Sequence, residues 1–196
     1  MNTVITKSYG APELSKKQIL RYAGVKAADE KTTELLNSVL AEAEGAFIYK
    51  VCYMELYACV SEEISDFGLF KIESHDLAKN LRGCEKIILF AATVGLGIDR
   101  LIAKYSHTSP AKALLLQALG TERVEALCDL FGEDMKANYG AKLCPRFSIG
   151  YGDTDLSRQK DILNILDAGR KIGISLNESM LMSPTKSVTA FIGISL

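Results

Sequence analysis

The sequence predicts an α+β fold, on the strength of three observations. Segments with helical and strand-like patterns are interspersed along the chain, without the regular βαβ alternation of parallel sheets. The chain has 196 residues, of which 48% are hydrophobic, enough for one sizeable core. Glycine and proline punctuate it evenly, and no repeat, low-complexity tract or linker stands out. We therefore expect a single domain over residues 1–196.

The first half of the chain is predicted to mix helices and strands. Ser15 and Ser74 stand where a side-chain oxygen can accept a bond from a helix N-terminus, and Gly45 follows an amphipathic stretch as a helix end. Alternating aromatic and apolar residues from Phe47 to Tyr53 favour a strand whose period becomes mixed later. Helices are therefore predicted over residues 15–22, 29–44 and 75–81, and strands at the start of 46–60 and over 67–72.

In the second half, the run KIILFAAT at residues 86–93 is continuously apolar and short, typical of a strand buried on both faces. The glycines at 95 and 97 then make the turn into helical stretches. Gly120 predicts a break within the longer of these, because glycine is a poor helix former. The predicted helices cover residues 98–105, 109–138 and 155–168, and extended chain is expected over 146–151, 174–178 and 187–194.

Composition limits the classes of partner and the compartment. The 23 basic and 24 acidic residues leave a net charge of −1, without the basic surplus of a nucleic-acid binder. No stretch approaches the roughly 20 apolar residues that span a bilayer, and residues 1–12 carry polar groups where a signal peptide needs an apolar run. We expect a cytoplasmic protein without membrane partners. In that reducing compartment most of the five cysteines should be small buried hydrophobes.

Several familiar catalytic and cofactor motifs are missing from the sequence. It has no GxxxxGK[ST] loop, no GxGxxG helix opening and no GxSxG elbow. Its two histidines, His75 and His107, stand alone, without an HExxH pattern or a Cys/His cluster, so no metal site is expected. The Asp-x-His-x-x-Gly pattern by which many corrinoid proteins coordinate cobalt is also missing. We expect no cobalamin held by this chain itself.

Two stretches near the C-terminus carry a resemblance to a known family. Residues 146–151 read Arg-Phe-Ser-Ile-Gly-Tyr, and residues 178–184 read Glu-Ser-Met-Leu-Met-Ser-Pro, followed by Ser-Val-Thr at 187–189. In this order they resemble the activation domain of cobalamin-dependent methionine synthase, and residues 91–129 resemble stand-alone members of that family. The resemblance implies helices around a mainly antiparallel, twisted sheet. One departure is Gly-Asp-Thr-Asp at residues 152–155, where the fused domain has prolines and a cysteine.

The resemblance also implies a binding site for S-adenosylmethionine. In the family, the Arg-x-x-x-Gly-Tyr stretch forms part of that site. Arg146 would clamp the ligand carboxylate with its planar fork, and Gly150 would let the ligand approach the backbone. Tyr151 would offer its ring to the adenine or the sulfonium, and Glu178 would pair with the ammonium or support the site.

Plainer interpretations of the same residues stay open. Without the resemblance, Arg146 is a surface arginine in an ordinary strand. Gly150 and Tyr151 then begin a simple turn, and Glu178 is an exposed strand residue. The methionines at 180 and 182 serve as core filler.

The resemblance implies an accessory role rather than independent catalysis. Such a chain would present S-adenosylmethionine to a cobalamin-binding methionine synthase that lacks its own activation domain, so that inactive cob(II)alamin is reductively methylated. Cobalamin would stay on that partner, and the electron would come from a flavodoxin-type donor. One alternative is a non-catalytic S-adenosylmethionine sensor or an assembly factor for another corrinoid protein. An independent small-molecule methyltransferase is a third, which the lack of a visible general base or metal site disfavours.

Overall fold

The centre of the molecule is an antiparallel sheet, as predicted. The structure, a computed structural model, describes residues 3–139 and 142–195. The strand order is β1-β2-β6-β11-β7, β8 also pairs with β11, and all these pairings are antiparallel. The strands are β1 (Ile5–Tyr9), β2 (Tyr49–Tyr57), β6 (Lys86–Thr93), β7 (Lys142–Leu143), β8 (Phe147–Ser148) and β11 (Ser187–Ser195).

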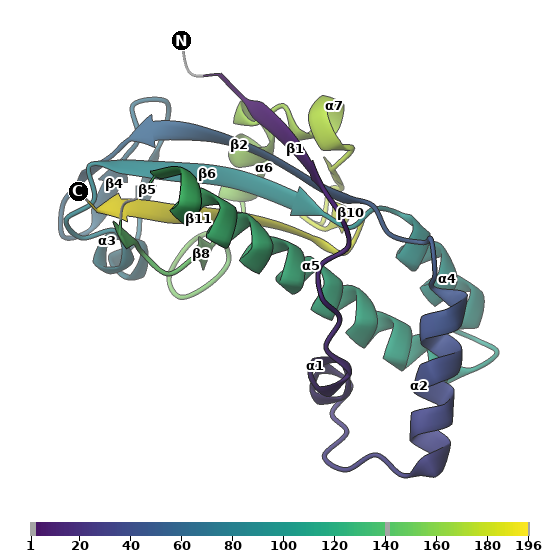
Figure 1. Cartoon of the computed structure of the whole chain (residues 1–196). Coiled ribbons are helices and arrows are strands. Elements are labelled where there is room, and N and C mark those ends of the chain that lie inside the picture. The colour runs from purple at the N-terminus through teal and green to yellow at the C-terminus, as the bar shows by residue number, and fades with distance from the viewer. Residues whose placement is uncertain (1–2, 140–141, 196) are drawn as a thin grey trace.

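Hydrophobic side chains cover both faces of this sheet. The long helix α5 (Pro110–Tyr139) crosses one face, and α3 (His75–Asn80), α6 (Arg158–Ile165) and α7 (Ala168–Ile172) pack on the other (Figure 1). Along β6, Ile88 and Phe90 belong to the core under α5, whereas Ile87 and Leu89 belong to the opposite core. This alternation explains why the β6 sequence is apolar throughout: the strand is central and both of its faces are buried.

Three further helices extend away from the sheet beside the first half of α5 (Figure 1). They are α1 (Lys16–Tyr22), α2 (Glu30–Glu42) and α4 (Gly97–Tyr105). The predicted cap at Ser15 is confirmed, because its hydroxyl accepts from the backbone N–H of Gln18 at 3.3 Å. Ser74 likewise accepts from Leu77 at 3.0 Å and starts α3. Local capping chemistry therefore located both helix starts correctly.

The predicted break in the long helix at Gly120 is wrong. Helix α5 runs without interruption from Pro110 to Tyr139. A Cβ at Gly120 would lie 2.9 Å from Cγ of Lys186 and 3.1 Å from Cγ1 of Ile98. The glycine therefore allows two other segments to approach the helix closely, and tertiary packing outweighs its poor helix propensity.

The predicted strand over residues 67–72 is also wrong in its position. The structure has a hairpin of β4 (Ile64–Asp66) and β5 (Lys71–Glu73), joined to β3 (Cys59–Val60) in a small antiparallel sheet. Residues 67–70 form its turn, where the N–H of Phe67 donates to the carbonyl of Phe70 at 3.0 Å. Both aromatic rings pack against Phe191 of β11, so the turn is apolar because it is part of the core.

The C-terminal region is more finely divided than predicted. The helix expected over residues 155–168 begins only at Arg158 and is separated from α7 by Asp167, whose φ of 49° interrupts the helical backbone. The strand expected over 174–178 is reduced to β9 (Ser175–Leu176), which pairs with β10 (Met182–Ser183). None of the helices in the described ranges combines the length and apolarity needed to cross a bilayer.

Candidate functional site

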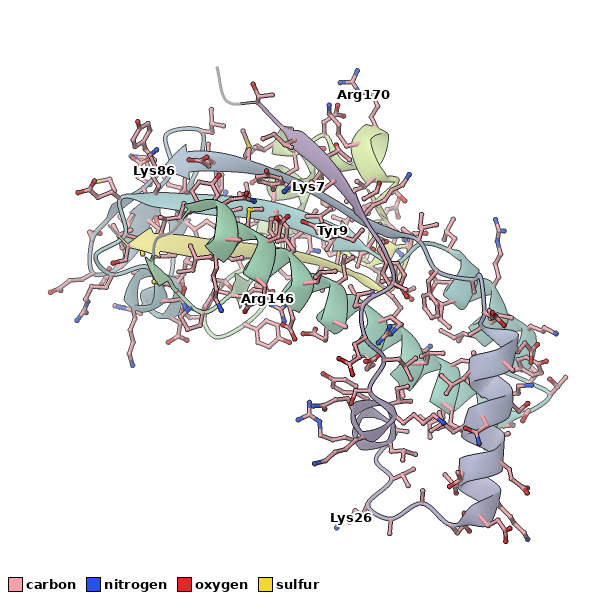
Figure 2. All side chains as sticks on the ribbon, viewed as in Figure 1. Lys7, Tyr9, Lys26, Lys86, Arg146 and Arg170 are labelled. Atoms are coloured by element: carbon pink, nitrogen blue, oxygen red, sulfur yellow. The ribbon has the colours of Figure 1, made fainter. Side chains whose placement is uncertain are left out.

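Arg146 lies beside the middle of α5, at the edge of the main sheet (Figure 2). It directly precedes β8, which pairs with β11 through Phe147 and Ser148. The guanidinium Nη2 donates to the carboxylate of Glu125 on α5. The Arg146 side chain is 25% exposed and that of Glu125 is 37% exposed, so the pair is reached by solvent. It is an ion pair at a surface rather than one sealed in the core.

A cavity of about 450 Å³ opens beside this ion pair. Its volume lies within the range of about 300–1,000 Å³ that small-molecule sites occupy. Arg146 and Tyr151 both line it, so the structure brings these two predicted site residues together. The other polar side chains on its wall come from four separate elements: Glu125, Ser148, Gln159, Ser187 and Thr189.

Gly150 belongs to the same segment, and its backbone conformation explains why this position is a glycine. Its φ is +88°, a region that L-residues with a side chain rarely adopt. The hydroxyl of Thr154 accepts from the N–H of Gly150 at 3.0 Å and donates to the carbonyl of Tyr151 at 2.6 Å. A Cβ on Gly150 would meet Leu156 at 3.0 Å. The glycine thus shapes the turn that presents Tyr151, whose residue surface is 70% exposed.

The departure from the family pattern after this turn has a structural explanation. Asp153 reaches the N-terminus of α3, where its carboxylate accepts from the Ser74 hydroxyl and from the backbone N–H of His75 at 2.8 Å. These hydrogen bonds, led by the one from Ser74, lower the pKa of Asp153 below its ordinary value. The turn that carries Tyr151 is therefore anchored to α3.

Glu178 lies apart from the other predicted site residues. It is exposed and lines a different cavity, of about 650 Å³, together with Asp167 and Asn177. Because it is not on the wall that Arg146 and Tyr151 share, the described geometry gives it no contact with that site. Its assignment to the ligand remains a prediction.

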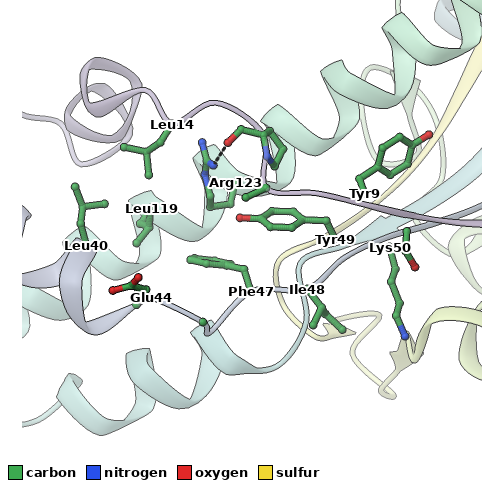
Figure 3. A pocket seen from close by; sticks show the side chains of 15 residues that line it. Tyr9, Leu14, Leu40, Glu44, Phe47, Ile48, Tyr49, Lys50, Leu119 and Arg123 are labelled. Carbon is green, nitrogen blue, oxygen red and sulfur yellow. Dashed lines mark hydrogen bonds between the residues drawn. The ribbon is translucent and has the colours of Figure 1, made fainter.

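A larger, mainly apolar cavity of about 760 Å³ lies where the N-terminal segment meets α2, β2 and α5. Figure 3 shows Leu40, Leu119 and Phe47 on one side of it, with Tyr9 and Lys50 toward the other. Arg123 of α5 also lines this cavity. The cavity thus contains an arginine as well, but one in a very different environment.

The hydrogen bonds of Arg123 are directed at the protein itself. Its Nε donates to Glu122 at 2.5 Å, and its two Nη groups donate at 2.7 Å to the carbonyls of Pro12 and Glu13. Glu122 accepts in addition from the backbone N–H of Ser15 at 2.9 Å. The Arg123 and Glu122 side chains are only 3% and 5% exposed. This network holds the N-terminal segment against α5, and the charges of Arg123 and Glu122 are satisfied within the protein.

Sequence reasoning missed Glu125, Gln159 and Thr189 as residues of the Arg146 cavity. Glu125 is 21 positions from Arg146 and lies on a different element, so no local spacing connects the two. Gln159 and Thr189 are 3% and 2% exposed, and a buried polar residue is the signal that could have indicated a site. That signal depends on burial, which the sequence alone does not give for these positions.

Fold and cavity together define the chain as an antiparallel α+β protein with an arginine at a small-molecule-sized surface cavity. The family model described as "Vitamin B12 dependent methionine synthase, activation domain" matches residues 75–195, more than half of the chain. The chain belongs to this family, as the resemblance of residues 146–151 and 178–189 had indicated.

A structural comparison agrees with this assignment. One solved structure, described as "Crystal Structure of the MetH Reactivation Domain bound to AdoHcy", is similar with a TM-score of 0.69 and 13% sequence identity. The similarity covers 97% of this chain and 78% of that one. At this identity the comparison establishes a shared fold. A search of curated proteins gave no match.

Proposed function

We propose that the chain binds S-adenosylmethionine in the cavity beside Arg146 and presents its methyl group to cobalamin on another protein. The observation that carries this proposal is the Arg146–Glu125 pair, which is solvent-accessible and stands at the wall of a cavity of about 450 Å³. The amino-acid end of S-adenosylmethionine carries a carboxylate and an ammonium. An arginine beside a glutamate offers a complementary charge to each.

Binding would replace the internal ion pair by two pairs with the ligand. The guanidinium fork of Arg146 suits bidentate contact with the ligand carboxylate, and Glu125 would accept from the ammonium. Because solvent reaches this partly buried pair and screens it, opening it costs less than breaking a pair sealed in the core. The exposed ring of Tyr151 is available to the adenine or the sulfonium.

The role in trans rests on family membership. Family members belong to cobalamin-dependent methionine synthase, so a cobalamin-binding synthase without its own activation domain is the proposed partner. The bound adenosyl compound named for the similar structure supports the same class of ligand. The contribution of this chain would be to orient the methyl donor and to exclude water at the contact with the partner. A flavodoxin-type protein would supply the electron.

The activity can be tested by following the absorbance of cob(II)alamin on such a synthase. With S-adenosylmethionine and a reductant present, adding the chain should accelerate conversion to methylcobalamin. Arg146→Lys should remove most of the acceleration, because a point charge does not reproduce the guanidinium fork. Arg170→Lys is the matched control and should retain it, since the Arg170 side chain is 82% exposed, pairs with Asp167 and does not line the Arg146 cavity.

An equal rate with and without the chain, at saturating ligand and partner, would contradict the accessory role. If S-adenosylmethionine still binds under those conditions, the alternative of a sensor or an assembly factor for another corrinoid protein takes its place.

A further inference from the structure

Two thiols from distant parts of the sequence lie in contact close to the Arg146 segment, residues 143–148. Sγ of Cys84 and Sγ of Cys144 are 3.3 Å apart, although the residues are 60 positions apart in the sequence. Cys84 lies in the turn between α3 and β6, and Cys144 lies between β7 and β8. Both are free cysteines. Cys144 is two positions before Arg146, so this contact joins the proposed ligand-binding segment to the turn between α3 and β6.

A glycine near the C-terminal end of the buried strand β11 makes room for the two sulfurs. A Cβ on Gly193 of β11 would lie 2.5 Å from Sγ of Cys84 and 3.3 Å from Cβ of Cys144. Glycine weakens a strand, and in a strand interior it often marks a place where another group approaches closely. The N–H of Cys144 also donates to the carbonyl of Gly193 at 2.9 Å. The strand is thus built to hold these thiols together.

The two sulfurs differ in their access to solvent. Cys84 is 5% exposed, and burial, followed by its contact with Cys144, raises its pKa to about 12. Cys144 is only half-buried and lines a surface cavity of about 670 Å³ that it shares with Arg146. A small reagent can therefore reach Cys144 first, with Cys84 directly behind it.

We propose that Cys84 and Cys144 form a dithiol modification site, which small-molecule disulfides such as oxidised glutathione convert reversibly to a protein disulfide. The thiolate of Cys144 attacks one sulfur of the reagent, the reagent's S–S bond breaks, and one glutathione thiolate leaves. The thiolate of Cys84 then attacks Cys144 in the mixed disulfide, which releases the second glutathione. The two protons of the protein thiols end on the two released glutathiones, so the protein is oxidised by two electrons and the reagent is reduced by two.

The disulfide should restrict the motion of the Arg146 segment. A disulfide has an S–S distance of about 2.05 Å, so the sulfurs must approach each other by more than ~1 Å and become covalently joined. The segment already has one tie to α3, because the side-chain amide of Asn80 donates to the carbonyl of Pro145 at 3.1 Å. A second, covalent tie should suppress local opening of residues 143–148.

The effect on ligand binding rests on the proposed function. If Arg146 holds S-adenosylmethionine, ordering its segment beforehand lowers the entropy lost on binding. Ordering one such side chain corresponds to an affinity gain of roughly threefold. Oxidation should therefore strengthen binding, and reduction should reverse the change.

The test uses the full chain with Cys59→Ser, which removes the exposed thiol from side reactions. The protein is incubated with oxidised glutathione and analysed by intact mass, peptide mapping and amide hydrogen exchange. We expect the loss of two hydrogens, a cross-linked peptide pair containing Cys84 and Cys144, and slower exchange over residues 143–148. Dithiothreitol should reverse all three changes. Cys144→Ser should show none of them, and Cys84→Ala should stop at a glutathione adduct on Cys144.

Several outcomes would overturn the modification site: a stable glutathione adduct on Cys144 without a disulfide in the parent protein, a disulfide to another cysteine, or no reaction. The consequence for ligand is measured separately, by titrating both forms with S-adenosylmethionine. If the disulfide forms and exchange slows while neither form binds ligand, the proposed function fails and the modification site stands. If both forms bind with equal affinity, the site holds no control over the ligand and that part of the inference is wrong.

Discussion

Two arginine–glutamate pairs that involve helix α5 differ in their exposure to solvent: one is buried, and solvent reaches the other. Arg123 and Glu122 are 3% and 5% exposed, and their remaining hydrogen bonds go to the backbone of the N-terminal segment. Arg146 and Glu125 are 25% and 37% exposed and stand at a cavity. The Arg146 guanidinium donates to Glu125, and Cys128 and Asp129 of α5 also lie near it.

This difference separates an arginine that holds the fold from one that is available to a ligand. Buried charge without a partner is costly, so the Arg123 network must stay intact for the N-terminal segment to remain in place. A pair that solvent reaches contributes less than a buried one and exchanges partners more readily. Substitutions in the two pairs and in the turn beside Arg146 should therefore differ in what they cost.

The largest effect should follow from breaking the buried pair. Arg123→Ala leaves the Glu122 carboxylate buried without its partner and removes two anchors of residues 12–13. Such a loss typically lowers the free energy of unfolding by about 3–5 kcal/mol. Urea denaturation followed by circular dichroism measures it. The matched variant Arg146→Ala, at a side chain that is 25% exposed, should lose less, about 1–2 kcal/mol. Equal losses in the two variants would remove the distinction between the arginines.

The second prediction concerns binding rather than stability. Arg146→Ala should weaken S-adenosylmethionine binding by roughly 10- to 100-fold, the equivalent of the ~1.5–3 kcal/mol that a hydrogen bond to a charged group contributes. Arg146→Lys should be nearly as weak, for want of the planar fork. Isothermal titration calorimetry gives the dissociation constants. Unchanged affinity in both variants would show that Arg146 does not contact the ligand.

The third prediction addresses the turn that presents Tyr151. Gly150→Ala places a side chain at φ +88° and about 3.0 Å from Leu156, so it should destabilise the protein by about 1–2 kcal/mol. Gly132→Ala is the control, since Gly132 lies within α5 and a Cβ there meets nothing within 4 Å. Thermal unfolding should show a lower Tm for the first variant and an equal or higher Tm for the second. The reverse order would contradict the conformational role of Gly150.

The smallest effect is a pH dependence at the anchor of that turn. Hydrogen bonds from Ser74 and the α3 backbone hold the pKa of Asp153 below its ordinary value of 3.8. A lowered pKa in the folded state means that the contribution is present above pH 3.8 and disappears as pH falls through the folded-state value. Asp153→Asn should therefore lower Tm slightly at pH 7, and the gap to the parent protein should narrow in acid. If the difference in Tm between Asp153→Asn and the parent protein stayed constant from pH 7 to pH 3, the titration of Asp153 would not contribute to stability.

Much of the fold could be predicted because its signals are local. The caps at Ser15 and Ser74 and the apolar run of β6 depend on neighbouring residues, and all three are where the sequence placed them. The predictions for Gly120 and for residues 67–70 were wrong because side chains from other elements determine the structure there. Lys186 approaches Gly120, and Phe191 packs against the turn. Contacts of this kind leave no periodic trace in the chain.

The candidate site likewise contains residues that a local motif predicts and residues that only folding brings together. Arg146 and Tyr151 were predicted together because they belong to one short motif, and the structure places them on one cavity. Glu125 was missed because only folding brings α5 to that motif, and Glu178 was grouped with them although it lines a different cavity. Motif spacing therefore identified the segment, whereas the charge that complements it came from the tertiary structure.

The assignment of Arg146 to the ligand carboxylate can be tested by a thermodynamic cycle measured by calorimetry. S-adenosylmethionine and its decarboxylated analogue are titrated into the parent chain and into Arg146→Ala, which gives the coupling between the ligand carboxylate and the guanidinium. We expect the parent chain to bind the carboxylated ligand at least tenfold more tightly than the analogue, a coupling of about 1.4 kcal/mol or more, and Arg146→Ala to bind both equally. The same preference in both proteins would contradict the assignment of Arg146 to the ligand carboxylate.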